Sequence, residues 1–208
     1  MKKFLIAALT LLAAGAPAAM AQLTASKAFA EAPKSVFPLL EPNTRLDMLD
    51  YFNAGMSTPS KNNLGGGSAI TALKPEFLSI NMSDASATQL FLLPAANDTV
   101  IGVIRTVSTP ALDSSMNLYT SQWQPLKKGA FTAPELKDWV TDSKEIDNVE
   151  SVVPFMLVDY AYDPATATLT LTNNLKDFLS DDIYSMVSPF LVPSITYVWD
   201  GKRFNRTK

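Results

Sequence analysis

The sequence predicts an α+β fold, built mainly from antiparallel sheet with a few short helices. Strand-like segments follow one another without a helix after each strand, which disfavours a parallel α/β sheet. The predicted order is helix, several strands, helix, hairpin, helix, hairpin. The 208 residues include no histidine and no cysteine. Disulfides and zinc sites with nitrogen or sulfur ligands are therefore excluded, and core packing must stabilise the fold.

The N-terminus has the features of a signal peptide. Lys2 and Lys3 precede an apolar run at residues 4–14, which is too short to cross a bilayer as a helix. The small residues of Ala-Met-Ala at 19–21 match what a signal peptidase reads. We therefore predict cleavage after Ala21 and a periplasmic or secreted protein. No later stretch is long and apolar enough to predict a transmembrane segment in the mature chain.

Length and charge limit the classes of partner. Cleavage would leave 187 residues (208 minus 21), enough for one core of ordinary size. We expect a loosely ordered lead-in at residues 22–34 and a single α+β domain at residues 35–208. Two lobes divided near residues 127–132 and one continuous sheet fit equally well. The mature chain would carry 15 basic and 20 acidic residues, a formal net charge of −5. This balance disfavours nucleic acid as a partner.

The charge is unevenly distributed along the chain. Residues 135–182 contain eleven acidic and three basic residues. The last seven residues contain Lys202, Arg203, Arg206 and Lys208. We interpret this basic end as a solvated terminus rather than as a contact with an acidic surface.

The first helix is predicted to begin at Thr44, whose hydroxyl can cap the first turn. Asp47 stands at the capping-box position, and Gly55 is a natural stop. The apolar face between them consists of Met48, Leu49 and Phe52.

Strands should follow the glycine turn at residues 63–68. Residues 78–83 alternate apolar and polar side chains, as a half-buried strand does. Residues 89–93 and 100–107 are apolar on both faces, which is typical of central strands. Residues 117–123 predict a further strand, and the spacings suit an antiparallel meander.

In the second half, the pattern Thr-Ala-Pro-Glu at residues 132–135 resembles a capping box and predicts a short helix. The side chains expected to face inward from it are Leu136, Trp139 and Val140. Residues 152–162 form the longest predicted strand, with a proline near its start. Residues 166–172 alternate cleanly and predict its neighbour.

The C-terminal part predicts helix and then hairpin. Residues 174–187 have the pattern of one helix or of two short ones. Residues 195–199 and 202–206 should pair as strands across a type I′ turn at Asp200-Gly201.

The residue types exclude most catalytic sites. A Ser-His-Asp or Cys-His set cannot form, and no calcium loop or phosphate loop is present. We predict no catalytic residue, metal site or cofactor. Paired carboxylates remain an option for general acid–base chemistry. Asp47 and Asp50 share a helix face, but it lies opposite the apolar face, so two solvated acids are the simpler interpretation.

Three charged residues stand in apolar surroundings. Helical spacing places Arg45 near the apolar face, and Arg105 and Asp159 lie within apolar strands. A charge in such a place requires a partner. The interpretations left open are a buried ion pair, a strand end that reaches solvent, or an anion-binding pocket lined by arginine. With Asp47 and Asp50, these residues are our candidates for ligand binding.

Asp98-Thr99-Val100 resembles the Asp-Ser/Thr-apolar site of O-glycosylation in periplasmic proteins of Bacteroidetes. Patterns of this length often arise by chance, so Thr99 is a candidate only.

Several segments resemble an uncharacterised secreted family of Bacteroidales, domain-of-unknown-function 3256. These are Phe-Pro-Leu-Leu at 37–40, Asn-x-Arg-Leu-Asp-Met-x-Asp at 43–50, Gly-Gly-Ser at 66–68, the strand patterns at 78–83 and 100–107, and Tyr-x-x-x-Trp-x-Pro-Leu at 119–126. The resemblance implies export in a Gram-negative bacterium and a role at the cell envelope. It supplies no catalytic residues.

The function most consistent with these features is a non-catalytic binding or assembly module of the cell envelope. It would bind an unknown envelope protein or a small ligand through a sheet face or a cleft. The alternative is a carboxylate-dependent hydrolase acting on glycan or cell-wall material. A third class, an inhibitor or assembly factor, predicts a sizeable exposed apolar patch.

Overall fold

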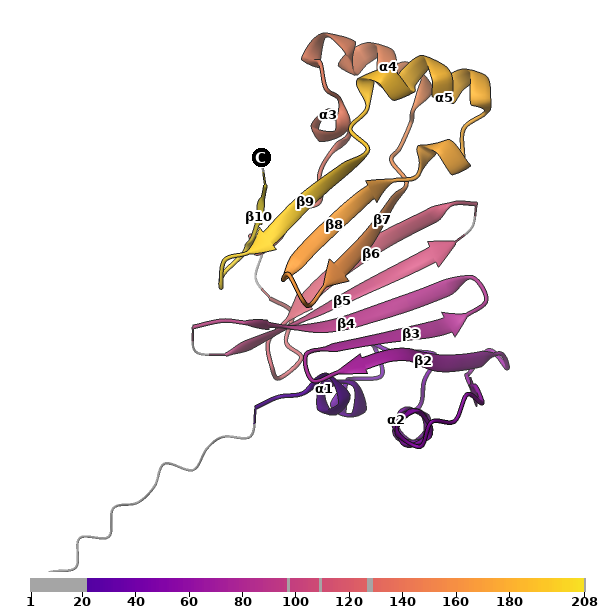
Figure 1. Cartoon of the computed structure of the whole chain (residues 1–208), viewed down its shortest axis with the longest axis vertical. Helices are drawn as coiled ribbons and strands as arrows, with labels where there is room; N and C mark the ends of the chain where they lie inside the picture. The colour runs from indigo at the N-terminus through magenta and orange to yellow at the C-terminus, as the bar shows by residue number, and fades with distance from the viewer. Residues whose placement is uncertain (1–21, 97, 109, 127–128, 208) are drawn as a thin grey trace, which may run out of the picture.

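The protein folds into two antiparallel sheets accompanied by short helices, as Figure 1 shows. This computed structural model describes residues 22–96, 98–108, 110–126 and 129–207. The prediction of an α+β fold with antiparallel sheet is confirmed. The predicted signal peptide at residues 1–21, with its cleavage site, lies outside the described residues.

The first sheet is a six-stranded meander whose strands are neighbours in chain order. Every pairing in it is antiparallel, in agreement with the predicted meander. Its strands are β1 (Ser60–Lys61), β2 (Gly67–Lys74), β3 (Phe77–Ser83), β4 (Ser86–Pro94), β5 (Thr99–Ser108) and β6 (Leu112–Tyr119).

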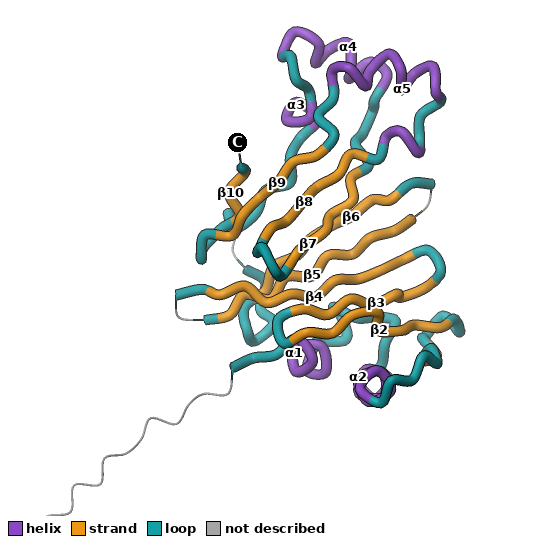
Figure 2. The backbone as a smooth tube through the Cα atoms, viewed as in Figure 1, coloured by secondary structure: helices purple, strands orange, loops and turns teal. Residues whose placement is uncertain are grey.

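The second sheet has four antiparallel strands in the order β10-β9-β8-β7. These strands are β7 (Val158–Asp163), β8 (Thr168–Asn173), β9 (Ser194–Trp199) and β10 (Phe204–Arg206). The chain crosses from the first sheet to the second between residues 119 and 158. This connection includes residues 127–132, where the sequence allows a division between two lobes. Figure 2 shows how this second group of strands lies against the first.

The helices form two groups at opposite ends of the molecule (Figure 1). The N-terminal pair is α1 (Ala25–Glu31) and α2 (Pro42–Asn53). The other group lies beyond the end of the second sheet and contains α3 (Leu136–Trp139), η1 (Ser143–Glu145), α4 (Ile146–Val152), η2 (Leu175–Asp177), α5 (Asp181–Val187) and η3 (Ser188–Phe190).

Strands β4 and β5 are buried on both faces, as their continuous apolar sequence predicts. On one face, Leu90 and Val103 pack in a cluster with Phe29 of α1. On the other face, Phe91 and Ile104 join a cluster that contains the core of the second sheet. The first sheet is therefore the middle layer between the N-terminal helices and the second sheet. Because the two sheets share one hydrophobic cluster, they are layers in contact.

Phe91 links the two sheets through an aromatic stack. It pairs with Gly102 across β4 and β5, and its ring occupies the space that a side chain at residue 102 would need. On its other side the ring stacks on Tyr162 of β7, with 4.0 Å between ring centroids and 14° between planes. Glycine at residue 102 thus lets an aromatic ring lie flat on the first sheet and contact the second.

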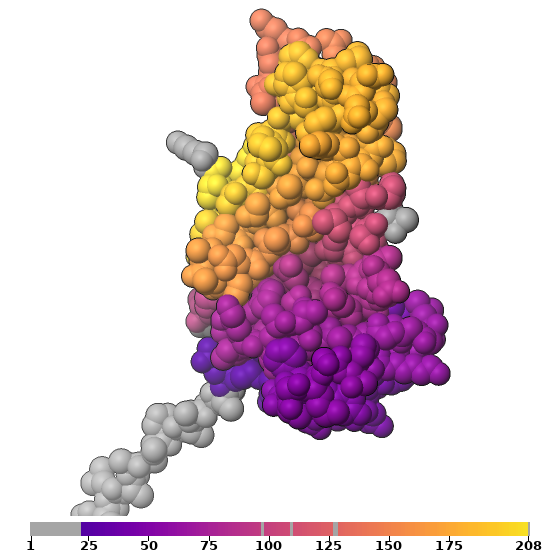
Figure 3. Space-filling view, turned by 45° about the vertical axis from the view of Figure 1, so that its right-hand side comes forward, coloured from indigo at the N-terminus to yellow at the C-terminus, as the bar shows by residue number. Residues whose placement is uncertain are grey.

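Side chains of the first sheet protect the edge of the second sheet that is formed by β7. The amides of Val158, Tyr160 and Tyr162 donate to Asp113 Oδ1 at 3.2 Å, Ser114 Oγ at 3.0 Å and Gln89 Oε1 at 3.0 Å. These alternate amides belong to the side of β7 that has no neighbouring strand. An unpaired edge invites pairing with other chains, and these bonds remove that possibility. The space-filling view shows the two sheets as one continuous body (Figure 3).

The expected loose lead-in at residues 22–34 is wrong for most of its length. Residues Ala25–Glu31 form α1, and Ala25, Ala28 and Phe29 are buried. The hydroxyl of Thr24 caps the helix by accepting from the amide of Lys27 at 3.2 Å. Alanine strongly favours helix, and its small side chains allow close packing without a conspicuous apolar period.

Two helix starts also differ from the prediction. Helix α2 begins at Pro42, with Glu41 as N-cap, because proline is well suited to the first turn. Thr44 therefore lies inside the helix. The stop is confirmed, since Gly55 follows the C-cap with φ of +68°. In α3 the capping box joins Glu135 and Asp138 rather than residues 132–135.

The strand expected at residues 152–162 is wrong in its first half. Helix α4 extends to Val152, and β7 begins only at Val158. The strand expected at residues 117–123 lies earlier, since β6 ends at Tyr119 and the chain then turns. These errors share a cause, because short apolar runs fit a helix end or a turn as well as they fit a strand.

The C-terminal hairpin is confirmed, but its turn is not the two-residue type. Trp199 pairs with Phe204, which leaves a loop of four residues, 200–203. The carboxylate of Asp200 accepts from the amides of Lys202 and Arg203, both at 2.8 Å. These side-chain bonds stabilise the wider turn in place of the type I′ geometry.

We predict that Gly102→Ala lowers the free energy of unfolding by about 1–3 kcal/mol, the usual cost of overpacking a core. A Cβ at residue 102 would overlap the ring of Phe91, which must move and lose its stack on Tyr162. Chemical denaturation measures the change. Gly66→Ala is the control, because its Cβ would meet no heavy atom nearer than 3.6 Å. Equal effects of the two substitutions would contradict this account.

We also predict a loss of stability above pH 10 that depends on two tyrosines. Burial, followed by the charges of nearby Asp113 and Glu76, raises the pKa of Tyr160 and Tyr162 to about 12. Since the folded pKa lies above the unfolded value of about 10, this stabilisation is complete below pH 10 and disappears as pH rises toward 12. Tyr160→Phe with Tyr162→Phe should flatten the decline in unfolding free energy between pH 9 and pH 11.

The control is Tyr51→Phe, because Tyr51 is exposed. It should leave the alkaline decline as steep as in the unchanged protein. An equally steep decline in the double variant would show that the buried phenols are not its cause.

Candidate functional site

Arg45 lies inside the protein rather than in a binding site. Its side chain is 2% exposed and projects from α2 toward the end of α1. The guanidinium Nη1 donates to the carbonyl oxygen of Phe29 at 2.6 Å, and its carbon lies 5.9 Å from the centroid of the Phe29 ring. This carbonyl belongs to the last turn of α1, and its backbone donor is the amide of Ala32 at 3.4 Å. The carbonyls at a helix C-terminus carry partial negative charge and attract cations. Arg45 thus stabilises the end of the neighbouring helix.

The charge of Arg45 has no carboxylate partner among the described residues. No ion pair includes it, and its Nε is buried without a hydrogen-bond acceptor in that part of the chain. Burial lowers the pKa of Arg45, and the charge of Glu41 partly offsets this effect. A guanidinium tolerates such a site better than an ammonium because it is more weakly hydrated.

Arg105 has a related role on the same side of the first sheet. Its Nη2 donates to the carbonyl oxygen of Val36 at 2.9 Å, and the side chain is half-buried. Like Arg45, it forms no ion pair within the described ranges. The two arginines therefore attach the segment from Phe29 to Val36 to α2 and β5. Neither of them lines the cavities described below.

The predicted acidic residues lie apart from the arginines. Asp47 and Asp50 are exposed on α2. Asp159 lies in the second sheet, where its Oδ1 accepts from Ser114 Oγ at 3.2 Å. Arg105 faces the helix layer, so Asp159 and Arg105 are on opposite sides of the first sheet. The structure does not bring the five candidate residues into one site, and ligand binding by them stays a prediction.

Thr99 begins β5 beside the turn that follows β4. Its amide donates to Asp98 Oδ1 at 2.7 Å, and the residue is half-buried. The pKa of Asp98 is lowered, mainly because the hydroxyl of Ser121 donates to its carboxylate. Glycosylation of Thr99 stays a prediction.

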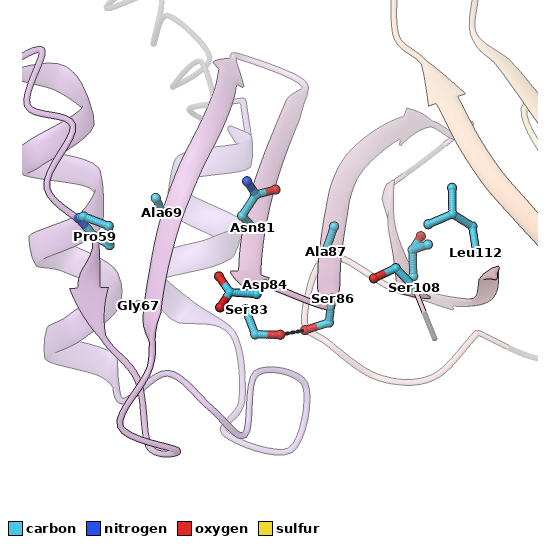
Figure 4. A pocket seen from close by; sticks show the side chains of 11 residues that line it. Pro59, Gly67, Ala69, Asn81, Ser83, Asp84, Ser86, Ala87, Ser108 and Leu112 are labelled. Carbon is cyan, nitrogen blue, oxygen red and sulfur yellow. Dashed lines mark hydrogen bonds between the residues drawn. The ribbon is translucent and has the colours of Figure 1, made fainter. Parts of the chain in front are cut away.

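One hollow lies over the ends of β2 to β5 and is shown in Figure 4. Its volume is about 480 Å³, and we call it the polar hollow. Its polar lining consists of Asn81, Ser83, Asp84, Ser86, Thr106 and Ser108. The hydroxyls of Ser83 and Ser86 bond to each other at 2.6 Å. The lining includes neither a cation nor an aromatic ring, so it supplies little binding energy for an anionic or aromatic ligand.

A larger cavity of about 1000 Å³ lies between three connections of the two sheets, and we call it the inter-sheet pocket. Its walls come from the β4–β5 turn, the segment after β6 and the β9–β10 turn. The apolar lining consists of Ala95, Val100, Pro125, Leu126, Ala130 and Trp199. The polar lining consists of Thr120, Gln124, Asp200, Lys202 and Arg203.

The polar atoms of this pocket leave Lys202 without an acidic partner among the residues described, while Arg203 forms a long ion pair with Asp200. Trp199 Nε1 donates to the carbonyl oxygen of Pro94 at 2.7 Å, so its ring presents apolar surface. The carboxylate of Asp200 accepts from backbone amides and from Asn205. These bonds, with the amide of Arg203 contributing most, lower the pKa of Asp200. Arg203 lies 3.9 Å from this carboxylate.

The carboxyl groups of the described residues show pKa shifts in one direction only. Every carboxyl whose pKa is shifted is shifted downward, through hydrogen bonds that stabilise the carboxylate: Glu41, Asp98, Asp163 and Asp200. A general acid of a glycosidase requires the opposite shift. Within the described ranges, no cluster of three or more acidic side chains could hold a metal ion.

The sequence did not predict this pocket, although the basic residues Lys202 and Arg203 were a signal for it. We had interpreted them as part of a solvated terminus. Trp199 and Pro94 meet across 105 positions of the chain, and no local pattern predicts such a contact. The four-residue turn then places both basic side chains at the rim of the pocket.

Among the helices of the described residues, none is long and apolar enough to cross a membrane.

The comparisons with known proteins agree with the predicted resemblance. The family model described as "Protein of unknown function (DUF3256)" matches residues 18–204. A solved structure of a domain of an uncharacterized protein from Porphyromonas gingivalis W83 superposes with a TM-score of 0.71 and 23% sequence identity. The superposition covers 88% of this chain and 96% of that one, which establishes a shared fold. No curated protein matches this chain.

We predict that Arg45→Lys lowers the free energy of unfolding by about 1–3 kcal/mol at pH 7, as expected when a buried hydrogen bond to a charged group is lost. A buried ammonium is poorly solvated, so its folded pKa falls below the unfolded value of about 10.4. The penalty is therefore full at low pH and shrinks as pH rises toward 10.4. Unfolding in denaturant at pH 7 and pH 9.5 measures it. Arg105→Lys is the control, because Arg105 is half-buried and should show a smaller penalty with little pH dependence.

Proposed function

The chain belongs to the family described as protein of unknown function (DUF3256), and because that description supplies no activity, we propose a function from the chain's own geometry. The protein is a non-catalytic binding module of the cell envelope. It binds a small amphipathic anion, an apolar molecule with one carboxylate or phosphate group, in the inter-sheet pocket.

The observation that supports this proposal is the combination of surfaces in one cavity. Trp199, Leu126 and Val100 supply apolar wall, while Lys202 and Arg203 stand together on the adjoining turn. Ligand pockets are mostly apolar with a few polar groups that fix orientation, and a volume of about 1000 Å³ suits a small molecule. Paired cations recognise carboxylate and phosphate groups.

The envelope setting rests on different support. It comes from the predicted signal peptide at residues 1–21 and from the family resemblance. The absence of cysteine and the bonds that protect the β7 edge are compatible with a protein whose core packing alone must stabilise it after export.

The alternative of a carboxylate-dependent hydrolase has weaker support. Glycosidases require two carboxyl groups that face each other, and the polar hollow and the inter-sheet pocket are each lined by one, Asp84 and Asp200. Glu76 and Asp98 both line a further cavity of about 590 Å³. The pKa of Asp98 is lowered, mainly by the hydroxyl of Ser121, whereas a general acid requires a raised pKa. We therefore favour binding without turnover.

We predict that the purified protein binds dodecanoate, an anionic probe with an apolar chain. Lys202→Met with Arg203→Met should weaken this binding about tenfold, or about 1.4 kcal/mol, since the carboxylate loses both cations. Ala95→Phe should weaken it as well by filling the cavity. Isothermal titration calorimetry measures the affinities. The matched control is Lys61→Met with Lys176→Met, which removes two exposed cations outside the pocket and should leave binding unchanged.

Two results would refute the proposal. One is equal affinity in the pocket variants and in the control. The other is binding of dodecanol as tight as that of dodecanoate, which would mean that the cations take no part.

A further inference from the structure

The group of short helices beyond the second sheet has a surface that the proposed function does not use. We define this helical end as residues 142–156 and 174–190, which include η1, α4, η2 and α5 (Figure 1). Its exposed large apolar side chains are Phe155 at 50%, Phe178 at 39%, Ile183 at 36% and Met186 at 65% of full exposure. Aromatic residues and methionine are enriched at protein–protein interfaces.

Two of these side chains form a surface aromatic pair. Phe155 follows α4 and Phe178 follows η2, and their ring centroids lie 5.4 Å apart at an angle of 42°. The amide of Phe178 donates to the carbonyl oxygen of Leu175 at 3.1 Å, so its backbone is held in place. The rings thus contact each other and remain available on their outer side. Ile183 and Met186 are three residues apart in α5 and share one face of that helix.

The same helical end carries most of the excess negative charge. It contains seven acidic residues against Lys144 and Lys176: Asp142, Glu145, Asp147, Glu150, Asp177, Asp181 and Asp182. None of the seven is in an ion pair within the described residues. Acids without ion-pair partners on the same group of short helices as exposed apolar side chains favour a partner with positive charge.

We propose that the helical end docks a partner protein through a segment rich in lysine or arginine with one apolar face. Its apolar side chains cover Phe155, Phe178 and Met186, and its cations face the surrounding carboxylates. Charge complementarity selects this occupant, because acidic lipid headgroups would be repelled by the same carboxylates. The proposal is independent of ligand binding in the inter-sheet pocket, which lies at the other end of β9.

A second copy of this chain is a less suitable occupant. Its basic turn offers Lys202 and Arg203, but large exposed apolar side chains do not accompany them on that turn. The cations of a second copy would therefore leave the aromatic pair uncovered. Measuring the oligomeric state distinguishes docking of a second copy from docking of a partner protein.

The test uses a helical peptide of leucine and lysine with one apolar face as the probe, and its glutamate counterpart as the negative probe. The full mature chain should bind the lysine peptide in calorimetry at low salt and should bind the glutamate peptide at least tenfold more weakly. Raising the salt should weaken binding of the lysine peptide, since screening reduces the attraction.

Two double variants locate the surface. Phe155→Ser with Phe178→Ser removes the aromatic pair, and Asp177→Asn with Asp182→Asn removes two charges. Each should weaken binding of the lysine peptide at least tenfold. Leu46→Ser with Met56→Ser and Asp47→Asn with Asp50→Asn are the matched controls, because they make the same kinds of change at exposed positions on and after α2. The controls should retain the original affinity, and circular dichroism verifies that every variant is folded.

Several results would overturn the proposal. They are absence of lysine-peptide binding, equal binding of both peptides, or equal losses in the controls and the helical-end variants. Sedimentation equilibrium that shows a dimer, abolished by the same helical-end variants, would identify a second copy as the occupant instead.

Discussion

The contact of Phe91 with Gly102 and Tyr162 joins the two sheets, and the arrangement of the rest of the molecule depends on it. Because the chain contains no cysteine, no disulfide joins the sheets, and apolar burial and the hydrogen bonds around it hold them together. A flat ring between a glycine and a tyrosine lets the second sheet approach closely at this point. The amides of β7 can then reach Gln89, Asp113 and Ser114 of the first sheet. Packing and edge protection therefore depend on each other.

Polar interactions on the opposite face have a different purpose. Arg45 and Arg105 each donate to a backbone carbonyl of the segment that links α1 and α2. A buried cation costs desolvation energy, and here it is compensated by a carbonyl and an aromatic ring rather than by a carboxylate. The pattern Asn-x-Arg-Leu-Asp-Met at residues 43–48 thus has a structural explanation, because Arg45 and Met48 are its buried positions. A catalytic or ligand-binding role is not needed to account for it.

The surfaces available for function lie where the two sheets and their helices end. The inter-sheet pocket combines apolar wall with two cations, and the helical end combines exposed aromatic rings with unpaired acids. The two surfaces have opposite charge and lie in different parts of the molecule. A small ligand and a protein partner could therefore occupy them at the same time.

The sequence by itself determined the fold class, the two-sided burial of β4 and β5, and the excess of acidic residues in the region that contains the helical end. These features follow from local periodicity and composition, which a chain expresses without distant contacts. It did not determine the partners of Arg45 and Arg105, the end of α4 at Val152, or the pocket around Trp199. Those depend on residues such as Pro94 and Trp199, 105 positions apart, meeting in space. Only tertiary packing decides such contacts, because the same apolar run is equally favourable in a strand, a helix end or a turn until a neighbouring layer covers it.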